Sequence, residues 1–267
     1  MRLVSKESEE RPRCWVSLHC KKYNYIFIHN PKCAGTTMSI LLERIGPCGG
    51  AGSGHKSIQE YKNEGIAIDN MFKWGFVRNP YDRVLSAYKY HLGFIDKFVS
   101  TGIPLDDLST FETYVHNLQK NMPGALHEPK GLQHLQHQHK YLCIDGKKAL
   151  DFIGKYENLK NDWGRVCGTL FQSTPDIEGE SNNVGELEVA ATHGKEESLK
   201  RLITEEYQNR GRAYGHPALP LEQMLALNTH SGHPYLKHYT TEMIEKVNQV
   251  YAKDFEIFGY EMEKGTR

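Results

Sequence analysis

The sequence has no long apolar segment and no excess of charge of either sign. No stretch of its 267 residues approaches the roughly 20 apolar residues that a membrane-spanning helix needs. Residues 1–15 (MRLVSKESEERPRCW) are charged, so no export signal is visible. Basic and acidic residues number 33 each, which disfavours a nucleic-acid-binding protein or a reader of charged membranes. We expect a soluble protein, cytoplasmic if the chain is full length.

Cysteine pairs and internal repeats are also missing. The six cysteines form no CxxC pair, which argues against a zinc ribbon, and they are too few for a disulfide-built scaffold. With 39% hydrophobic residues, a chain of this length can bury a large core. We predict a single domain over residues 1–267, with a polar N-terminal extension (1–23) and an acidic, mobile excursion (174–200).

What the chain does contain is a strand, polar turn, helix pattern that occurs twice. Residues 25–29 and 72–77 have the β-branched and aromatic composition of strands. Each is followed by a polar turn and an amphipathic helix, at 36–45 and 81–90. This pattern predicts an α/β fold with a parallel sheet flanked by helices, and ligands at the carboxyl ends of the strands. Further expected elements are a strand at 149–154, helical segments at 57–64, 111–141, from 156 onward and at 240–251, and aromatic residues at 254–260 that pack on the core.

The first turn, Asn30 to Thr37 (NPKCAGTT), has the composition of an anion site. A helix N-terminus presents unpaired N–H groups and a positive dipole end, which favour phosphate. Lys32 adds a charge, and Thr36 and Thr37 add hydroxyl groups. The turn lacks GxxxxGK[ST], so NTP hydrolysis is disfavoured. A plain helix cap is the alternative interpretation.

The second turn follows residue 77. Arg78 ends the strand and Ser86 comes eight residues later, about two helical turns on, so both are placed to line one side of a cleft. Arginine is suited to bidentate phosphate contact. Two phosphate sites predict a ligand that is phosphorylated at two positions. The alternative is a surface ion pair between Arg78 and Asp82, with Ser86 facing solvent.

Together, FIHNPKCAGTT (27–37) and FVRNPYDRVLSAY (76–88) resemble the two signatures of sulfotransferases that use 3′-phosphoadenosine 5′-phosphosulfate (PAPS). The closest resemblance is to the carbohydrate O-sulfotransferases, in particular the uronyl 2-O-sulfotransferases and their short microbial relatives. DFIGKYENLKNDW (151–163) and residues 239–260 resemble later segments of that family.

The resemblance implies a P-loop-kinase-like sheet, PAPS as sulfuryl donor, adenosine 3′,5′-bisphosphate (PAP) as product, and no metal. It implies that Arg78 and Ser86 hold the 3′-phosphate, and that Lys237 belongs to a loop over the nucleotide, with Asn228 and His233 as further candidates. The residues that it implies around the 5′-phosphosulfate are Pro31, Lys32, Cys33, Ala34, Gly35, Thr36 and Thr37.

Catalysis is implied for His55 and Lys32. The uronyl enzymes carry a His-Gly-His segment between the two motifs, and here the matching residues are Ser53, Gly54 and His55. His55 would act as the base, since a histidine accepts a proton near neutral pH, and Lys32 would stabilise the leaving phosphate. Lys56 would supply further charge near the acceptor.

A histidine- and glutamine-rich stretch gives weaker candidates for the acceptor site, namely Gln136, Gln138 and His139. His134 and His137 are three residues apart and His139 is close by, but no carboxylate at ligand spacing accompanies them, so no metal site is expected.

The expected partner is a hydroxyl-bearing acceptor, most simply a saccharide. Sulfation of a small-molecule alcohol is an alternative within the enzyme class. An ATP-dependent kinase-like protein and a non-catalytic nucleotide- or glycan-binding protein are alternatives outside it. Because animal members of the family are Golgi membrane proteins, a truncated luminal domain is the alternative to a cytoplasmic protein.

Overall fold

The computed structural model describes residues 18–21, 23–38, 42, 54–126, 132–172 and 234–265. Its main sheet has four strands in the order β1 (Leu18–Cys20), β2 (Tyr25–Ile28), β3 (Phe72–Val77) and β6 (Phe152–Lys155). β2, β3 and β6 run parallel, as predicted, although the third strand begins three residues later than expected. β1 pairs antiparallel with β2, so residues 18–20 belong to the sheet and not to an extension.

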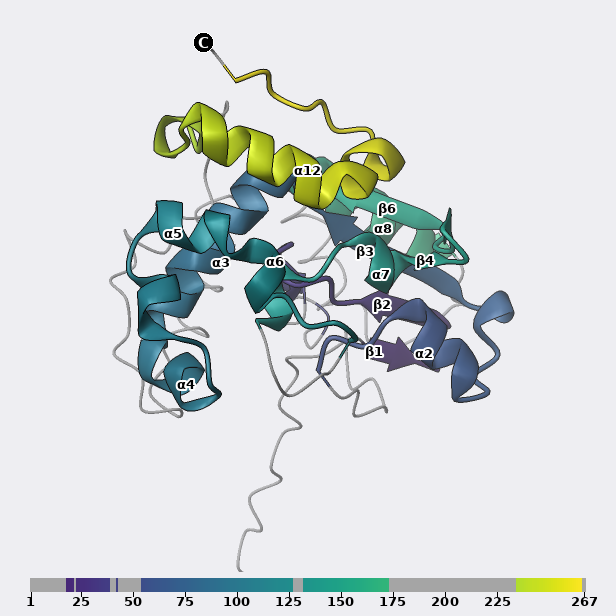
Figure 1. The fold of residues 1–267 in the computed structure, drawn as a ribbon. Coiled ribbons are helices and arrows are strands. Elements are labelled where there is room, and N and C mark those ends of the chain that lie inside the picture. Colours follow the sequence, from purple (N-terminus) through teal and green to yellow (C-terminus); the bar gives the residue numbers. More distant parts are fainter. Residues whose placement is uncertain are drawn as a thin grey trace, which may run out of the picture.

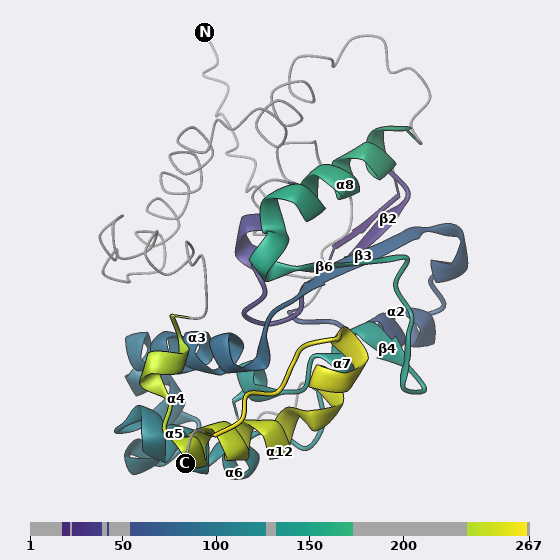
Figure 2. The same cartoon turned by 90° about the horizontal axis from the view of Figure 1, so that it is seen from above.

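Both faces of this sheet are covered by helices, as Figures 1 and 2 show. Tyr25, Phe27, Trp74 and Phe76 point to one face and pack with α8 (Leu159–Gln172). The alternate residues of β2 pack on the other face with α2 (Ile58–Asn63), α7 (His139–Leu142) and the end of α12 (Thr241–Phe258). Burial on both faces explains why the strands are almost continuously apolar.

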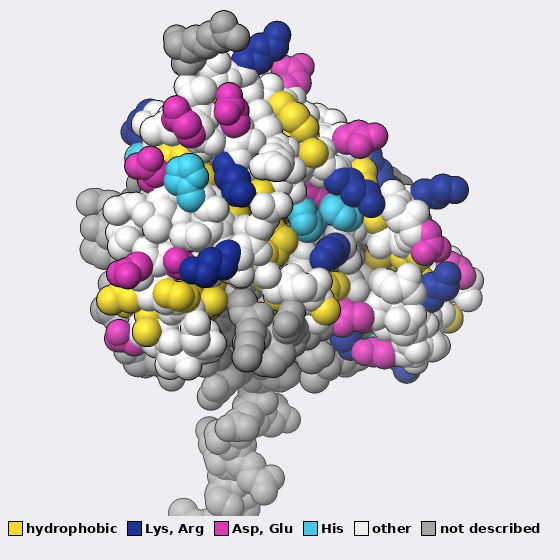
Figure 3. Space-filling model, in the orientation of Figure 1, with side chains coloured by type: hydrophobic (Ala, Val, Ile, Leu, Met, Phe, Trp, Pro, Cys, Tyr) yellow, Lys and Arg dark blue, Asp and Glu magenta, His cyan; other side chains and the backbone are white. Residues whose placement is uncertain are grey.

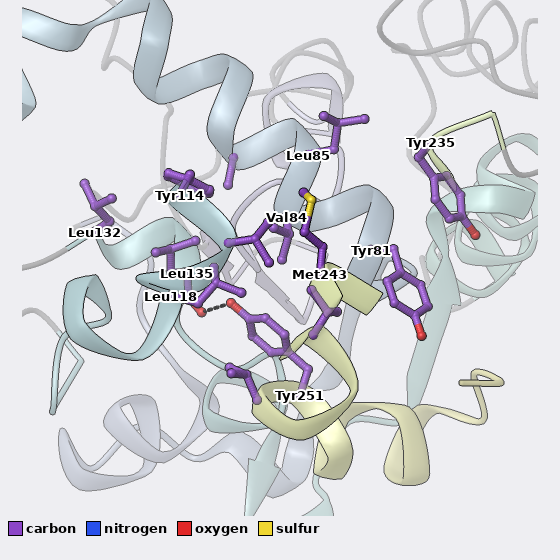
Figure 4. Packing of buried hydrophobic residues seen from close by; sticks show 14 of the residues in the cluster. Tyr81, Val84, Leu85, Tyr114, Leu118, Leu132, Leu135, Tyr235, Met243 and Tyr251 are labelled. Atoms are coloured by element: carbon purple, nitrogen blue, oxygen red, sulfur yellow. Dashed lines mark hydrogen bonds between the residues drawn. The ribbon is translucent and has the colours of Figure 1, made fainter. Parts of the chain in front are cut away.

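A second apolar cluster lies beside the sheet (Figure 4). It joins α12 to α3 (Pro80–Gly93), α4 (Ile95–Ser100), α5 (Phe111–His116) and α6 (Leu118–Asn121). Met243 and Tyr251 of α12 pack here, and the Tyr251 hydroxyl donates a hydrogen bond of 2.7 Å to the Leu135 carbonyl. This cluster fixes the segment around residue 135, which enters the site described below.

The prediction of a continuous helical segment at 111–141 is wrong, because the described part of this segment is divided into short helices. The described part consists of α5, α6, a 3-10 turn at Gln133–Leu135 and α7. Pro123 and Gly124 follow α6, and neither favours continuing a helix. A two-stranded hairpin, β4 (Cys143–Ile144) with β5 (Lys147–Lys148), was also missed. Its turn is Asp145-Gly146, both with positive φ, a common two-residue hairpin turn.

The other helices follow their sequence signals. Ser57 and Glu60 form a capping box at the start of α2, and Thr240 caps α12. The helices predicted at 57–64, 81–90 and from 156 are confirmed; the helix predicted at 240–251 continues to Phe258. Residues 35–38 begin the first predicted helix, while most of 39–45 and all of 174–200 lie outside the described residues. The remaining short elements are 3-10 turns at Ile68–Asn70, Leu105–Leu108, Tyr156–Asn158 and Leu236–His238.

None of the helices in the described ranges has the length and apolar character required to cross a bilayer.

Candidate functional site

The two polar turns lie side by side, because they follow neighbouring parallel strands. The register pairs Ile28 of β2 with Gly75 of β3, so both chains leave the sheet at the same edge. Arg78 Nη1 donates a hydrogen bond of 3.2 Å to the Lys32 carbonyl, which joins the second turn to the first. The structure thus brings both sequence motifs into one site.

The first turn has a backbone shape that suits an anion. Lys32 and Ala34 both adopt left-handed conformations, with φ of 64° and 63°. Alternation of this kind turns successive N–H groups toward one side and forms a concave anion site. Gly35 is required, because a Cβ there would lie 1.7 Å from the His29 ring. Thr36 and Thr37 lie in the first helical turn and are partly exposed, whereas Pro31 is buried.

Cys33 is buried within this turn, where its thiol contacts neighbouring side chains. Its Sγ lies 3.2 Å from Gln138 Oε1 and 3.2 Å from Asn30 Nδ2, and it is 2% exposed. Burial raises the pKa of the Cys33 thiol to about 12, so the reactive thiolate is scarce at neutral pH.

The side chain of Gln138 holds the two turns together. Its Oε1 accepts hydrogen bonds from Arg78 N at 2.9 Å and from Asn30 Nδ2 at 3.1 Å, and its Nε2 donates to the Arg78 carbonyl at 2.9 Å. Gln138 is fully buried. The amide therefore satisfies both backbone groups of Arg78 where β3 ends and no further strand pairing is available. Sequence reasoning assigned Gln138 to the acceptor, and only the three-dimensional contact reveals this role.

Asp254 of α12 fixes Gln138 in turn. Its carboxylate accepts hydrogen bonds from the backbone N–H groups of Gln138 and His139, at 2.8 and 3.0 Å, and from His139 Nδ1 at 2.6 Å. Burial raises the pKa of Asp254, but these hydrogen bonds and the charge of Arg83 outweigh that effect and lower it. The carboxylate is therefore ionised at neutral pH and acts as an anchor for α7.

His137, His139 and Asp254 are also the one group of potential metal ligands among the described residues, with ligand atoms within 4.8 Å of one another. The expectation that no carboxylate accompanies the histidines was wrong, since Asp254 reaches them from more than a hundred residues away. The oxygens of this carboxylate already accept three hydrogen bonds, two from backbone N–H groups and one from the His139 ring.

Arg78 lies almost entirely buried in the second turn. Its Nε forms an ion pair of 2.7 Å with Asp82, and the guanidinium stacks on Tyr156 at 3.9 Å. The alternative interpretation of an Arg78–Asp82 pair is correct about the partners, but the pair is buried, with side chains 5% and 8% exposed. Its position is therefore fixed without a ligand.

A pocket of about 100 Å³ opens beside Arg78. It brings together three residues that the sequence singled out separately, namely Arg78, Ser86 and Lys237. Four of its lining side chains are Lys or Arg or His and one is acidic, which suits an anion. The lining residues are Arg78, Asp82, Leu85, Ser86, Lys89, Pro234, Tyr235, Lys237 and His238.

The Lys32 ammonium group has an unusually low pKa for a lysine. Its Nζ lies 4.3 Å from the centre of the Tyr90 ring. Burial, and then the nearby charge of Arg78, lower the pKa of the Lys32 ammonium to about 7. An anion bound in the turn would raise this pKa again, because opposite charge favours the ammonium form.

His55 lies at the centre of a group of histidine rings. Its ring centre is 4.5 Å from that of His29 and 5.6 Å from that of His134. The His55 Nδ1 lies 2.9 Å from the His29 carbonyl, which can only accept, so Nδ1 carries the proton. In the neutral form of the ring, Nε2 is then the nitrogen that carries the lone pair, which is what a general base requires. Sequence reasoning did not place His29 or His134 here.

The remaining candidates are already engaged. Lys56 pairs with Glu64 at 2.8 Å and lies over the Tyr61 ring. Gln136 is fully buried, donating to the Pro123 carbonyl and accepting from His137 N, so it presents no amide group to an acceptor. His139 is bound to Asp254. Ser53, Asn228 and His233 lie outside the described residues.

Two turns whose shape and charge suit anions lie at the carboxyl edge of a parallel sheet, with a basic pocket and the His55 imidazole beside them, and this edge is where α/β proteins place their ligands. Comparison with family profiles gives a match of residues 17–261 to the Sulfotransferase family. The chain therefore belongs to the sulfotransferase family, whose members transfer a sulfuryl group. Searches of curated proteins and of solved structures found no match.

The Gln138 contact generates a stability prediction. Gln138→Leu keeps the side-chain volume but leaves the buried N–H and C=O of Arg78 without partners, at about 1–3 kcal/mol each. We expect the free energy of unfolding, measured by urea titration, to fall by about 2–5 kcal/mol.

The matched control is Gln119→Leu, because Gln119 is exposed and makes one exposed hydrogen bond to Lys246. The control should change the free energy of unfolding by less than about 0.5 kcal/mol. Equal effects of the two substitutions would show that Gln138 does not hold the turns.

Proposed function

We propose that this protein is a PAPS-dependent O-sulfotransferase. The observation that supports the proposal most strongly is that two separate turns, each with a composition that suits an anion, lie in one site at a spacing set by adjacent strands. A nucleotide with phosphates at two positions fits such a pair. The first turn, residues 31–37, would take the 5′-phosphosulfate, and the pocket of Arg78, Ser86 and Lys237 would take the 3′-phosphate.

The chemistry proposed is in-line transfer. The acceptor hydroxyl gives its proton to Nε2 of His55 while its oxygen forms a bond to sulfur. The bond between sulfur and the 5′-phosphate oxygen breaks, and the electron pair remains on the phosphate. Lys32 and the amides of the first turn stabilise that charge, as in oxyanion-type catalysis. These steps are carried by protein groups without a metal.

For the acceptor we propose a saccharide hydroxyl, on the resemblance of the motifs to carbohydrate sulfotransferases. A densely anionic polymer would need a broad basic surface. On the face shown in Figure 3, basic and acidic side chains are interspersed, and Lys56 beside His55 is paired with Glu64. These features favour a neutral or weakly charged acceptor.

Release of PAP from PAPS with a panel of saccharides and small alcohols tests the activity and separates these classes of acceptor. No release with any acceptor would contradict the proposed activity.

Binding of PAP should be accompanied by proton uptake. With a pKa of about 7, Lys32 is mostly neutral at pH 8 in the empty protein, and a bound phosphate raises that pKa. At pH 8 we expect uptake approaching one proton, and an affinity that falls as pH rises above 7. At pH 6, Lys32 is charged in both states and contributes no uptake. Isothermal titration calorimetry in buffers of different ionisation enthalpy measures the proton count.

Lys32→Met should abolish this uptake, and Lys97→Met, at an exposed lysine, should preserve it. Proton uptake that is absent at pH 8 in the wild type, or unchanged in Lys32→Met, would contradict the placement of Lys32 at the phosphate.

His55→Ala should separate binding from turnover. The substitution removes the proposed base but leaves both phosphate sites, so we expect an unchanged Kd for PAP and a kcat reduced on the order of 10²-fold or more. His116→Ala, at an exposed histidine, is the control. A kcat that survives His55→Ala would rule out the assignment of the base.

A further inference from the structure

Three side chains, two of them fully buried, lead from α5 into the histidine group beside His55. The Tyr114 hydroxyl lies 2.8 Å from His91 Nδ1, and His91 Nε2 lies 3.0 Å from His134 Nδ1. Tyr114 and His91 are both 0% exposed. Figure 4 shows Tyr114 in the apolar cluster that α12 shares with α3 and α5. The proposed function assigns no role to any of the three.

His134 is held firmly at the inner end of this row. Arg83 Nη1 donates a hydrogen bond of 3.0 Å to the His134 carbonyl. The imidazole packs on the Tyr90 ring, with centres 4.5 Å apart, and edge-on against His55. Lys32 Nζ lies 4.3 Å from the centre of the same Tyr90 ring. His134 therefore lies near both the proposed base, His55, and the lysine proposed to stabilise the leaving phosphate.

The positions of the hydrogens along this row follow from counting donors. The Tyr114 hydroxyl has one hydrogen and makes no second hydrogen bond to the described residues. A buried donor without a partner costs about 1–3 kcal/mol, so the hydroxyl donates to His91 Nδ1. His91 is neutral, because burial and the charge of Lys32 lower its pKa to about 3. Its single proton is therefore on Nε2 and is donated to His134 Nδ1.

The same count fixes the tautomer of His134. Burial first, and then repulsion from Lys32 and from any neighbouring histidine that becomes protonated, hold the pKa of His134 well below its usual range, so this ring is also neutral. With Nδ1 accepting from His91, its proton is on Nε2. That atom makes no hydrogen bond to the described part of the chain, and the side chain is partly exposed.

We propose that His134 is a neutral hydrogen-bond donor of the active site, and that its Nε2–H binds an oxygen of the sulfuryl group during transfer. The inference rests on the proposed function. His55 supplies a lone pair and His134 supplies a donor, so the two imidazoles have opposite roles set by different partners. His134 keeps its proton throughout and stabilises the charge on the group transferred. Tyr114 and His91 are positioning residues that fix its tautomer.

The tautomer can be read without any turnover. Two-dimensional ¹H–¹⁵N correlation of the histidine rings should show a protonated Nε2 and an unprotonated Nδ1 for His134 at pH 7. Tyr114→Phe removes the hydroxyl hydrogen at nearly constant volume and should shift His134 toward the Nδ1–H form. Tyr88→Phe, whose ring also packs on Tyr114, should leave the His134 signals unchanged. A charged His134, or an Nδ1–H form in the wild type, would overturn the inference.

Two substitutions at residue 134 test the role in transfer. The amide of Gln can reach the position of Nε2 and keep a donor in the site, whereas the amide of Asn takes the position of Nδ1 and keeps only the contact with His91. We expect His134→Asn to lower kcat on the order of 10²-fold and His134→Gln to lower it less than about 10-fold, with the Kd for PAP unchanged in both.

A purely structural role of His134 predicts the opposite order, because Asn preserves the buried contact. Asn as active as Gln would therefore overturn the inference. If the wild type shows the expected tautomer but neither binds PAP nor transfers sulfuryl, the proposed function is what fails, and the role of His134 in transfer fails with it.

Discussion

The pairing between the Gln138 amide and the backbone of Arg78 is the contact on which the site depends. It replaces the strand pairing that β3 loses at residue 78. The side-chain oxygen of Gln138, which accepts from Arg78 N, also accepts a hydrogen bond from Asn30 of the first turn. Asp254 then ties Gln138 to α12. Two turns distant in sequence are thus held in one site by this buried amide, together with the hydrogen bond from Arg78 to the Lys32 carbonyl, and α12 sets the position of Gln138.

Burial also determines which groups are charged. Arg78 carries the permanent charge of a guanidinium, and Asp82 pairs with it at 2.7 Å. Lys32 forms no ion pair within the described part of the chain, and burial, with the nearby charge of Arg78, lowers its pKa to about 7. His91 and His134 are neutral for the same reason. The site therefore avoids several unpaired positive charges, and it can accept protons and anions together when a ligand binds.

Much of this architecture could be predicted from the sequence, because its signals are local. The strands at 25–29 and 72–77, the turns after them and the helix caps all lie within short windows. β1 is three residues long and was hidden in a polar start, and the Asp145-Gly146 hairpin signal was overlooked. The roles of Gln138, Asp254 and His134 depend on contacts between segments about 40 to 116 residues apart, which no local pattern contains.

The most direct test of the central claim, that the two turns form one site for a doubly phosphorylated nucleotide, is the change in melting temperature with different nucleotides. The account predicts that adenosine 3′,5′-bisphosphate raises the melting temperature clearly more than AMP, which can fill only the first turn, and more than ATP with magnesium. Stabilisation by ATP with magnesium alone, or equal stabilisation by AMP and the bisphosphate, would contradict it.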